Sequence, residues 1–134
     1  MKTKRLINQL LFITFVVINF SFVIRNNNNV MRKTSNNTYI INTSTIISHN
    51  IKGFKGATPL EVYIKNNKII KIVPLPNNET PKFFTKVKSI MLPKFNNKKL
   101  SNIHNIDGVT GATYSSKAVK ANIEAAIDYY KKHK

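Results

Sequence analysis

The strongest constraint on the fold is a strand, turn and strand pattern in the middle of the chain. Over residues 60–65, apolar side chains alternate with polar or amphipathic ones, which is the period of a strand with one buried face. The following pair, Asn66 and Asn67, tolerates the left-handed backbone of a tight turn. Residues 69–73 supply a returning strand. The pattern predicts a β-hairpin and therefore an antiparallel sheet.

The C-terminal segment carries the pattern of an amphipathic helix. Its apolar side chains recur at helical spacing at Val119, Ile123, Ile127 and Tyr130. Several alanines between them favour helix, and the basic tail 131–134 suits the negative end of a helix dipole. Ser115 or Ser116 is the expected N-cap.

Between the hairpin and this helix, the apolar spacing predicts a short helix over residues 83–92 that Pro93 stops. An extended piece is expected around residues 95–106. The predicted fold class is therefore α+β, with a small antiparallel sheet and packed helices.

An uncharged apolar stretch occupies residues 6–24, directly after a basic N-terminus. As a helix it would reach roughly 28 Å, close to the thickness of a bilayer core. We expect residues 1–25 to be a transmembrane anchor, with a cleaved signal segment as the alternative. The basic start favours a cytoplasmic N-terminus, so the rest of a single-span membrane protein would lie on the extracytoplasmic side. Residues 26–50, rich in Asn, Ser and Thr, are predicted to be a linker with a short strand around 39–47, and the folded domain is expected at 51–134.

Composition narrows the chemistry. The chain has no cysteine, which excludes disulfides, thiolate-held zinc, iron-sulfur clusters and a cysteine nucleophile. Its formal charge of +17 favours polyanions, but the lysines are scattered and no nucleic-acid partner is expected. The histidines show no metal-ligand spacing, and five acidic residues in all disfavour hydrolase chemistry.

The segment 107–116, Asp-Gly-Val-Thr-Gly-Ala-Thr-Tyr-Ser-Ser, stands directly before the C-terminal helix. The first backbone N–H groups of a helix have no partner within it, and the positive end of the dipole favours an anion. Gly111 would let a ligand come close to the backbone. Asp107 is unsuited to touching a phosphate, so we expect it to cap Val109 or Thr110, or to serve a modifying enzyme. On these grounds alone the segment is either an anion site or an ordinary start of a helix.

This segment, followed by Ala-Val-Lys-Ala-Asn-Ile at 118–123, resembles the signature of the FMN-binding domain family. The family includes flavin subunits of sodium-pumping NADH:quinone reductases and Rnf-type complexes. The resemblance extends upstream to residues 53–60 and to the turn Glu79, Thr80 and Pro81. It implies FMN as the cofactor, joined from FAD to the final threonine of the motif, Thr113, by a flavin transferase. Ser115 stands where many relatives have a second threonine.

The resemblance assigns the following cofactor-binding residues by position. Thr113 would carry the phosphoester, Thr110 and Ser115 would contribute hydroxyl contacts, and Gly111 and Ala112 would bring backbone close to the phosphate. Tyr114 either stacks near the flavin or covers the core. Glu79, Thr80 and Pro81 either flank the ring system or form a plain turn. Residues 53, 54, 56 and 58 either line the same cavity or shape the start of the hairpin.

The expected function is that of a membrane-tethered flavoprotein that carries electrons between redox partner proteins. Two alternatives remain at this point. One is a basic tethered module that binds anionic polymer or lipid without a cofactor, and the other is a flavin-dependent reductase of a small substrate.

Overall fold

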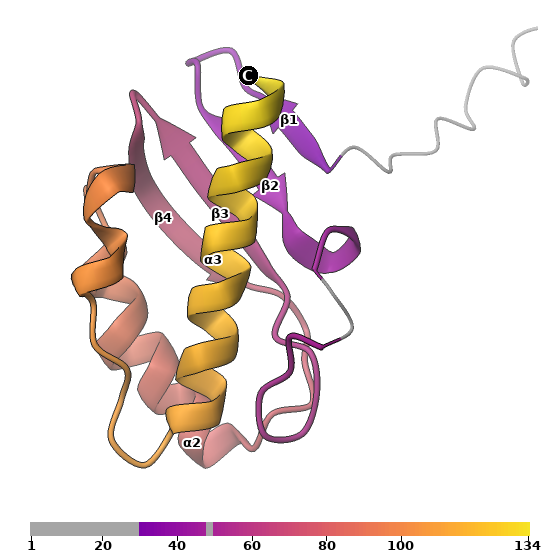
Figure 1. Cartoon of the computed structure of the whole chain (residues 1–134), viewed down its shortest axis with the longest axis vertical. Coiled ribbons are helices and arrows are strands. Elements are labelled where there is room, and N and C mark those ends of the chain that lie inside the picture. Colours follow the sequence, from indigo (N-terminus) through magenta and orange to yellow (C-terminus); the bar gives the residue numbers. More distant parts are fainter. Residues whose placement is uncertain (1–29, 48–49) are drawn as a thin grey trace, which may run out of the picture.

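A computed structural model describes residues 30–47 and 50–134 (Figure 1). Four strands form one antiparallel sheet in the order β1-β2-β3-β4. Their bounds are β1 Met31–Lys33, β2 Tyr39–Asn42, β3 Leu60–Lys65 and β4 Lys68–Pro74. A 3-10 turn, η1 (Thr43–Thr45), follows β2. The small antiparallel sheet with packed helices confirms the predicted α+β class.

The central hairpin is confirmed in its strands and its turn. Lys65 pairs with Lys68, and both intervening asparagines have positive φ, 51° at Asn66 and 56° at Asn67. This is the backbone of a two-residue turn that matches the twist of the strands. Further along, Tyr63 pairs with Lys71 while Ile64 pairs with Ile69, so a bulge falls at Ile70.

The segment 26–50, expected to be a linker, contributes strands to the sheet. β2 occupies the first half of the short strand expected at 39–47, and η1 follows it. The expectation did not include β1, which pairs with β2 through Lys33 and Tyr39. Ile41 on β2 is fully buried, which supplies the apolar contact that holds these strands against the rest of the domain.

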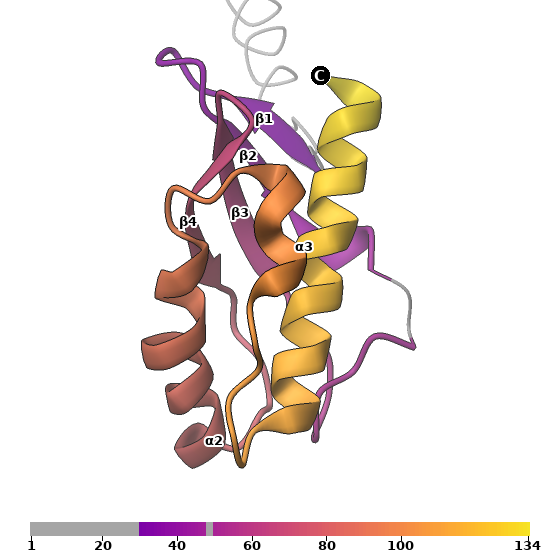
Figure 2. The same cartoon turned by 60° about the vertical axis from the view of Figure 1, so that its left-hand side comes forward.

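The helical segment after β4 runs further than expected. It comprises α2 (Pro81–Lys86), a π turn η2 (Val87–Met91) and a 3-10 turn η3 (Leu92–Phe95). Pro93 does not end the helical path, because it lies in the first turn of η3, where a backbone N–H is not needed. Figure 2 shows this segment running beside β4.

The extended piece expected at 95–106 is wrong. Residues Leu100–Asn105 form a 3-10 helix, η4. The residues at and just before its start make an isolated bridge from Lys99 to Lys68 and backbone hydrogen bonds to Asn67 and Ile69. Leu100, Ile103 and Ile106 are all buried, and their spacing of three is the 3-10 period.

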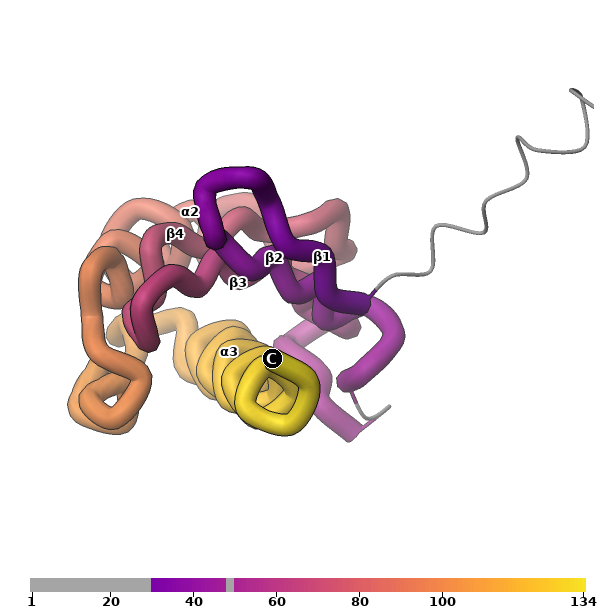
Figure 3. The backbone as a smooth tube through the Cα atoms, turned by 90° about the horizontal axis from the view of Figure 1, so that it is seen from above, coloured from indigo at the N-terminus to yellow at the C-terminus, as the bar shows by residue number. Residues whose placement is uncertain are grey.

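The long helix α3 (Thr113–His133) lies along one face of the sheet (Figure 3). Its predicted apolar face is confirmed, since Val119, Ile123, Ile127 and Tyr130 are all buried. These side chains form one core with the inward residues of β3, Leu60, Val62 and Ile64. The other face of the sheet is mostly polar, as an antiparallel sheet allows, although Ile40 is buried on it opposite Tyr63. It carries an ion pair of 3.0 Å between Arg32 and Glu61.

In the ranges 30–47 and 50–134, no helix combines the length and the apolar character that crossing a membrane requires. The apolar stretch 6–24, expected to be a transmembrane anchor, lies outside the described residues.

Candidate functional site

The first turn of α3 is an uncapped helix start. The N-cap residue is Ala112, which offers no side-chain hydrogen bond, and the helix begins at Thr113. The residue before the cap, Gly111, has φ +82°, a conformation that disfavours any other residue. The leading N–H groups of this turn therefore face outward without a side-chain acceptor, where the positive end of the helix dipole favours an anion.

The expected serine caps are wrong for a physical reason. Ser115 and Ser116 lie inside the helix and are buried. Ser115 donates its hydroxyl hydrogen to Glu79, and Ser116 accepts a hydrogen bond of 3.0 Å from the N–H of Val109. Both hydroxyls therefore connect the helix to neighbouring segments. The bond to Ser116 also replaces the expected capping of Val109 by Asp107, which is exposed.

An open, mostly apolar cavity of about 240 Å³ lies beside the helix start. Its walls are Phe54, Phe83 and residues 111–115. Phe54 and Tyr114 leave 66% and 67% of their surface exposed, and together with Phe83 they line one cavity, as neighbouring exposed apolar side chains do at binding sites. Their ring centroids are 6.3 Å apart and the planes are inclined by 48°. Such a pair of exposed rings can contact a flat aromatic ligand.

A second, more polar cavity of about 340 Å³ lies on the other side of Thr113. It is lined by Gly108, Val109, Thr110, Thr113, Ser116, Lys117 and Lys120. The Lys120 amine donates 2.8 Å to the Ile106 carbonyl oxygen and so closes the end of η4. Thr113, whose side chain is exposed, borders both cavities.

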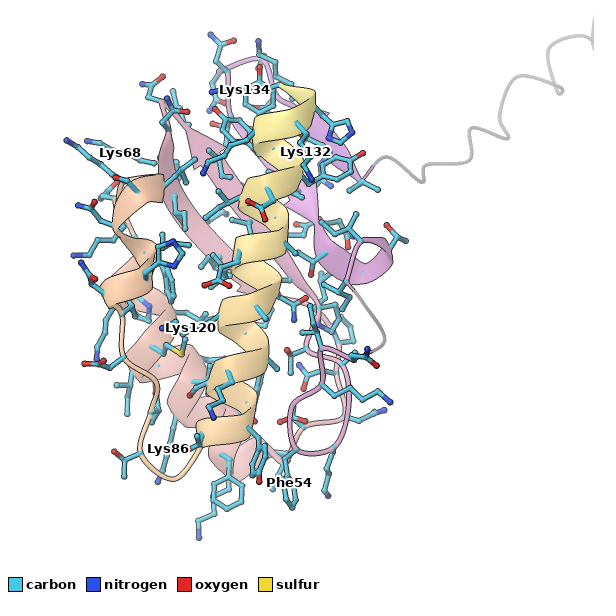
Figure 4. The ribbon with its side chains drawn as sticks, in the orientation of Figure 1. Phe54, Lys68, Lys86, Lys120, Lys132 and Lys134 are labelled. Carbon is cyan, nitrogen blue, oxygen red and sulfur yellow. The ribbon has the colours of Figure 1, made fainter. Side chains whose placement is uncertain are left out.

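A further cation comes from α2. The Lys86 amine lies 3.9 Å from the point where a Cβ on Gly111 would stand, so it reaches over the glycine that precedes the helix. Figure 4 shows Lys86 and Phe54 at the end of the molecule where α3 begins. Positive charge at this end suits an anionic group near Thr113.

Below the aromatic cavity lies a buried carboxylate, Glu79, which is 6% exposed. It accepts hydrogen bonds from the backbone N–H groups of Phe54 (3.1 Å), Lys55 (2.7 Å) and Gly56 (3.2 Å), and from the Ser115 hydroxyl. Burial alone would raise the pKa of Glu79, but the bonds from Ser115 and the loop amides outweigh it and hold this pKa below its ordinary value. The side chain therefore stays charged, although no ion pair within residues 30–47 and 50–134 includes it.

The structure gathers most of the predicted site residues and separates a few. Gly111, Ala112, Thr113, Tyr114 and Ser115 line the aromatic cavity, and Thr110 joins Thr113 at the polar one. Glu79 supports the cavity from below. Thr80 and Pro81 serve as the N-cap and first residue of α2 and line neither cavity.

The sequence interpretation missed four side chains near the site, Phe83, Lys86, Lys117 and Lys120. Phe83 was assigned to the apolar face of a short helix, yet it is 36% exposed. The spacing of Phe83 and Lys86 was the available signal. Residues three positions apart share a helix face, so a lysine there indicates that the face carrying Phe83 is not entirely buried.

Fold and site together define an α+β ligand-binding domain suited to a molecule with a flat ring and an anionic group. Residues 53–128 match the model of the FMN-binding domain, and the chain belongs to this family. FMN is accordingly its cofactor, which removes the cofactor-free alternative. The match excludes β1 and β2, which nevertheless belong to the sheet. No curated protein and no solved structure matches the chain.

The residues present fit FMN. The cofactor has a flat tricyclic ring, a polyhydroxylated chain and a phosphoryl group. The aromatic cavity offers Phe54, Phe83 and Tyr114 to the ring. The uncapped helix start, with Lys86 above Gly111, offers N–H groups and positive charge to the phosphoryl group.

Proposed function

We propose that this chain is a membrane-tethered electron carrier whose FMN is joined by a phosphoester to Thr113. The observation that carries the proposal is the position of Thr113, exposed at the first position of α3 and bordering both the aromatic and the polar cavity. A group bonded to this hydroxyl can extend its ring into one cavity while its phosphoryl oxygens remain near the N–H groups of the helix.

The neighbouring hydroxyls are less suitable for attachment. Ser115 and Ser116 are buried and hydrogen-bonded, so a transferase could reach them only after the first turn of α3 opened. Thr110 is exposed but borders only the polar cavity. These differences favour Thr113.

Attachment of FMN would be a phosphoryl-group transfer in which no atom changes oxidation state. The Thr113 oxygen bonds to the phosphorus of the FMN half of FAD, the phosphoanhydride bond breaks, and AMP leaves. The hydroxyl proton passes to the transferase or to solvent. The linked phosphoryl group keeps a negative charge, which the start of α3 and Lys86 stabilise.

Bound FMN supplies reversible uptake of electrons. The chain's contribution is to hold the ring in a shallow cavity walled by exposed aromatic side chains, where a partner protein can approach it. The apolar stretch 6–24 would keep the domain at an extracytoplasmic membrane surface and raise its effective concentration near membrane redox partners.

The attachment is tested by co-expressing the full chain with a flavin transferase. Wild-type protein should fluoresce under ultraviolet light after denaturing electrophoresis, and its intact mass should rise by FMN less one water. Thr113→Ala should abolish both signals, while Thr113→Ser and the matched control Thr110→Ala should keep them. Signal retained in Thr113→Ala and lost in Ser115→Ala would place the bond at Ser115 instead.

The carrier role and the tether need separate assays. Washed membranes should retain the full chain, and protease added outside intact cells should remove the domain. Loaded protein should be reduced by membranes with their native donors and should turn over poorly with a reduced nicotinamide alone. Rapid turnover of a small substrate with that donor and no partner protein would indicate a reductase.

A further inference from the structure

The buried carboxylate of Glu79 joins two elements that are distant in sequence. It lies before α2, and its donors come from the glycine loop, defined here as residues 53–56, and from the first turn of α3 at Ser115. Three consecutive backbone N–H groups that converge on one anion form a tight cradle. The loop is also closed on itself by a 2.7 Å bond from the Gly53 N–H to the Gly56 carbonyl.

A charge in this position requires an explanation. A buried carboxylate is costly unless it is paired or fully hydrogen-bonded. The ion pairs among the described residues lie elsewhere, between Arg32 and Glu61 and between His104 and Glu124. Glu79 is thus satisfied by hydrogen-bond donors alone, and its charge strengthens each of those bonds.

Gly53 is required for this contact. A Cβ at Gly53 would stand 2.5 Å from one Glu79 oxygen and 2.8 Å from the other, so any side chain would displace the carboxylate. By contrast, a Cβ at Gly56 would meet nothing within 4 Å. The loop therefore approaches the carboxylate closely at one glycine and leaves the other free.

The two anchored segments carry the exposed aromatic residues of the cavity. Phe54 is itself one of the N–H donors to Glu79, and Tyr114 directly precedes Ser115. Both rings are largely exposed, so packing in the core does not fix them. Their separation of 6.3 Å depends on the backbone beneath them, and Glu79 joins the two pieces of that backbone.

We propose that Glu79 is a positioning residue for the flavin: by connecting the glycine loop to the start of α3, it sets the spacing between Phe54 and Tyr114 against which the ring packs. The inference rests on the proposed placement of the FMN ring in the aromatic cavity. It goes further because it makes Glu79, which does not line the cavity, responsible for the distance between the two rings that do.

The test compares Glu79→Gln with the matched control Glu61→Gln, which removes a carboxylate on the polar face of the sheet. Both full-length variants are loaded with FMN beside the wild type. We expect the flavin of Glu79→Gln to shift its visible absorption toward that of free FMN and to fluoresce several-fold more brightly, because the rings no longer hold it. Glu61→Gln should match the wild type. Hydrogen exchange at the amides of residues 54–56 should accelerate in Glu79→Gln alone.

Several outcomes separate the two hypotheses. If Phe54→Ala and Tyr114→Ala both leave the flavin spectrum unchanged, the ring lies elsewhere and the placement in the proposed function is wrong. If these variants alter the spectrum while Glu79→Gln does not, the positioning role is overturned and the placement stands. A Glu79→Gln protein that is less stable but has a wild-type flavin spectrum would also overturn it.

Should Glu79→Gln fail to fold, Ser115→Ala provides a milder variant, because it removes one donor and leaves the three loop amides in place. It should shift the flavin spectrum in the same direction by a smaller amount. An unchanged spectrum in folded, loaded Ser115→Ala would contradict the coupling between the loop and α3.

Discussion

Replacing Gly53 with alanine should destabilise the domain far more than the same change at Gly56. At Gly53 the new methyl group would meet the Glu79 carboxylate at 2.5 Å, and reaching an ordinary contact of 3.4 Å requires a shift of about 0.9 Å. The carboxylate bonds to the loop are 2.7 to 3.2 Å long. A shift of that size takes most of them beyond hydrogen-bonding range.

The magnitude follows from those bonds. Hydrogen bonds to charged groups contribute about 1.5–3 kcal/mol each, and water can replace part of what is lost at this half-exposed loop. Alanine in place of glycine returns about 0.4–1 kcal/mol by restricting the unfolded chain. We therefore expect Gly53→Ala to cost roughly 2–3 kcal/mol, which corresponds to roughly 10–20 °C in melting temperature for a domain of this size.

Thermal unfolding of the full chain, followed by far-ultraviolet circular dichroism, measures this difference. Gly56→Ala should melt at or slightly above the wild-type temperature, because the added methyl group meets no atom within 4 Å. The double variant Gly53→Ala with Glu79→Ala should lose less than the sum of its parts, since the clash is then absent. Equal melting temperatures for the two glycine variants would refute the reasoning.

Three further predictions concern other parts of the domain. Folding lowers the pKa of Glu79, so its contribution to the free energy of unfolding is present above about pH 4.3 and is lost as pH falls through the folded-state pKa. Urea titrations at several pH values should therefore show the free energy of unfolding fall toward acid pH, and Glu79→Gln should reduce that fall. Asn66→Val should cost about 1–2 kcal/mol because φ there is 51°, while Asn66→Gly should be nearly neutral in the same melting assay. Lys86→Glu should slow FMN loading several-fold at low salt and less at high salt, as a fluorescence time course can show. Lys71→Glu, which changes the charge beside Tyr63 on the sheet face opposite α3, should not slow it.

Elements with a strict local period were predictable. The alternation in β3 and the spacing in α3 identify one buried face each, and the asparagine pair between β3 and β4 allows few other conformations. Those elements determine the sheet and the helix that covers it. The prediction of an extended piece at 95–106 failed because the apolar residues there recur every three positions over only two turns of η4. So short a repeat is hard to tell from an irregular strand.

The site was predictable only in part. The segment around Thr113 could be identified because a glycine and several hydroxyls precede a helix, and because the family motif matches it. The choice of N-cap was wrong, since the partners of Ser115 and Ser116 come from Glu79 and Val109, one of them distant in sequence. Lys86 was missed for the same reason, because only the folded chain brings α2 over Gly111.

The serines and the threonine of the motif have different roles because of where the helix turn and the neighbouring chain place them. At about 100° per residue, Ser115 lies roughly opposite the outward-facing Thr113 and is buried. Ser116 lies only about 60° from Thr113, but it is also buried, and the segment at Val109 bonds to it. One turn can therefore present a reactive hydroxyl to solvent while two others secure that turn to Glu79 and to the N–H of Val109. Attachment at an anchored turn limits the motion of the linked cofactor, because the first atom beyond the protein is fixed by the helix itself. A flexible loop bearing the same hydroxyl would leave the ring free to sample solvent, and the aromatic cavity would then have to supply all of the ordering.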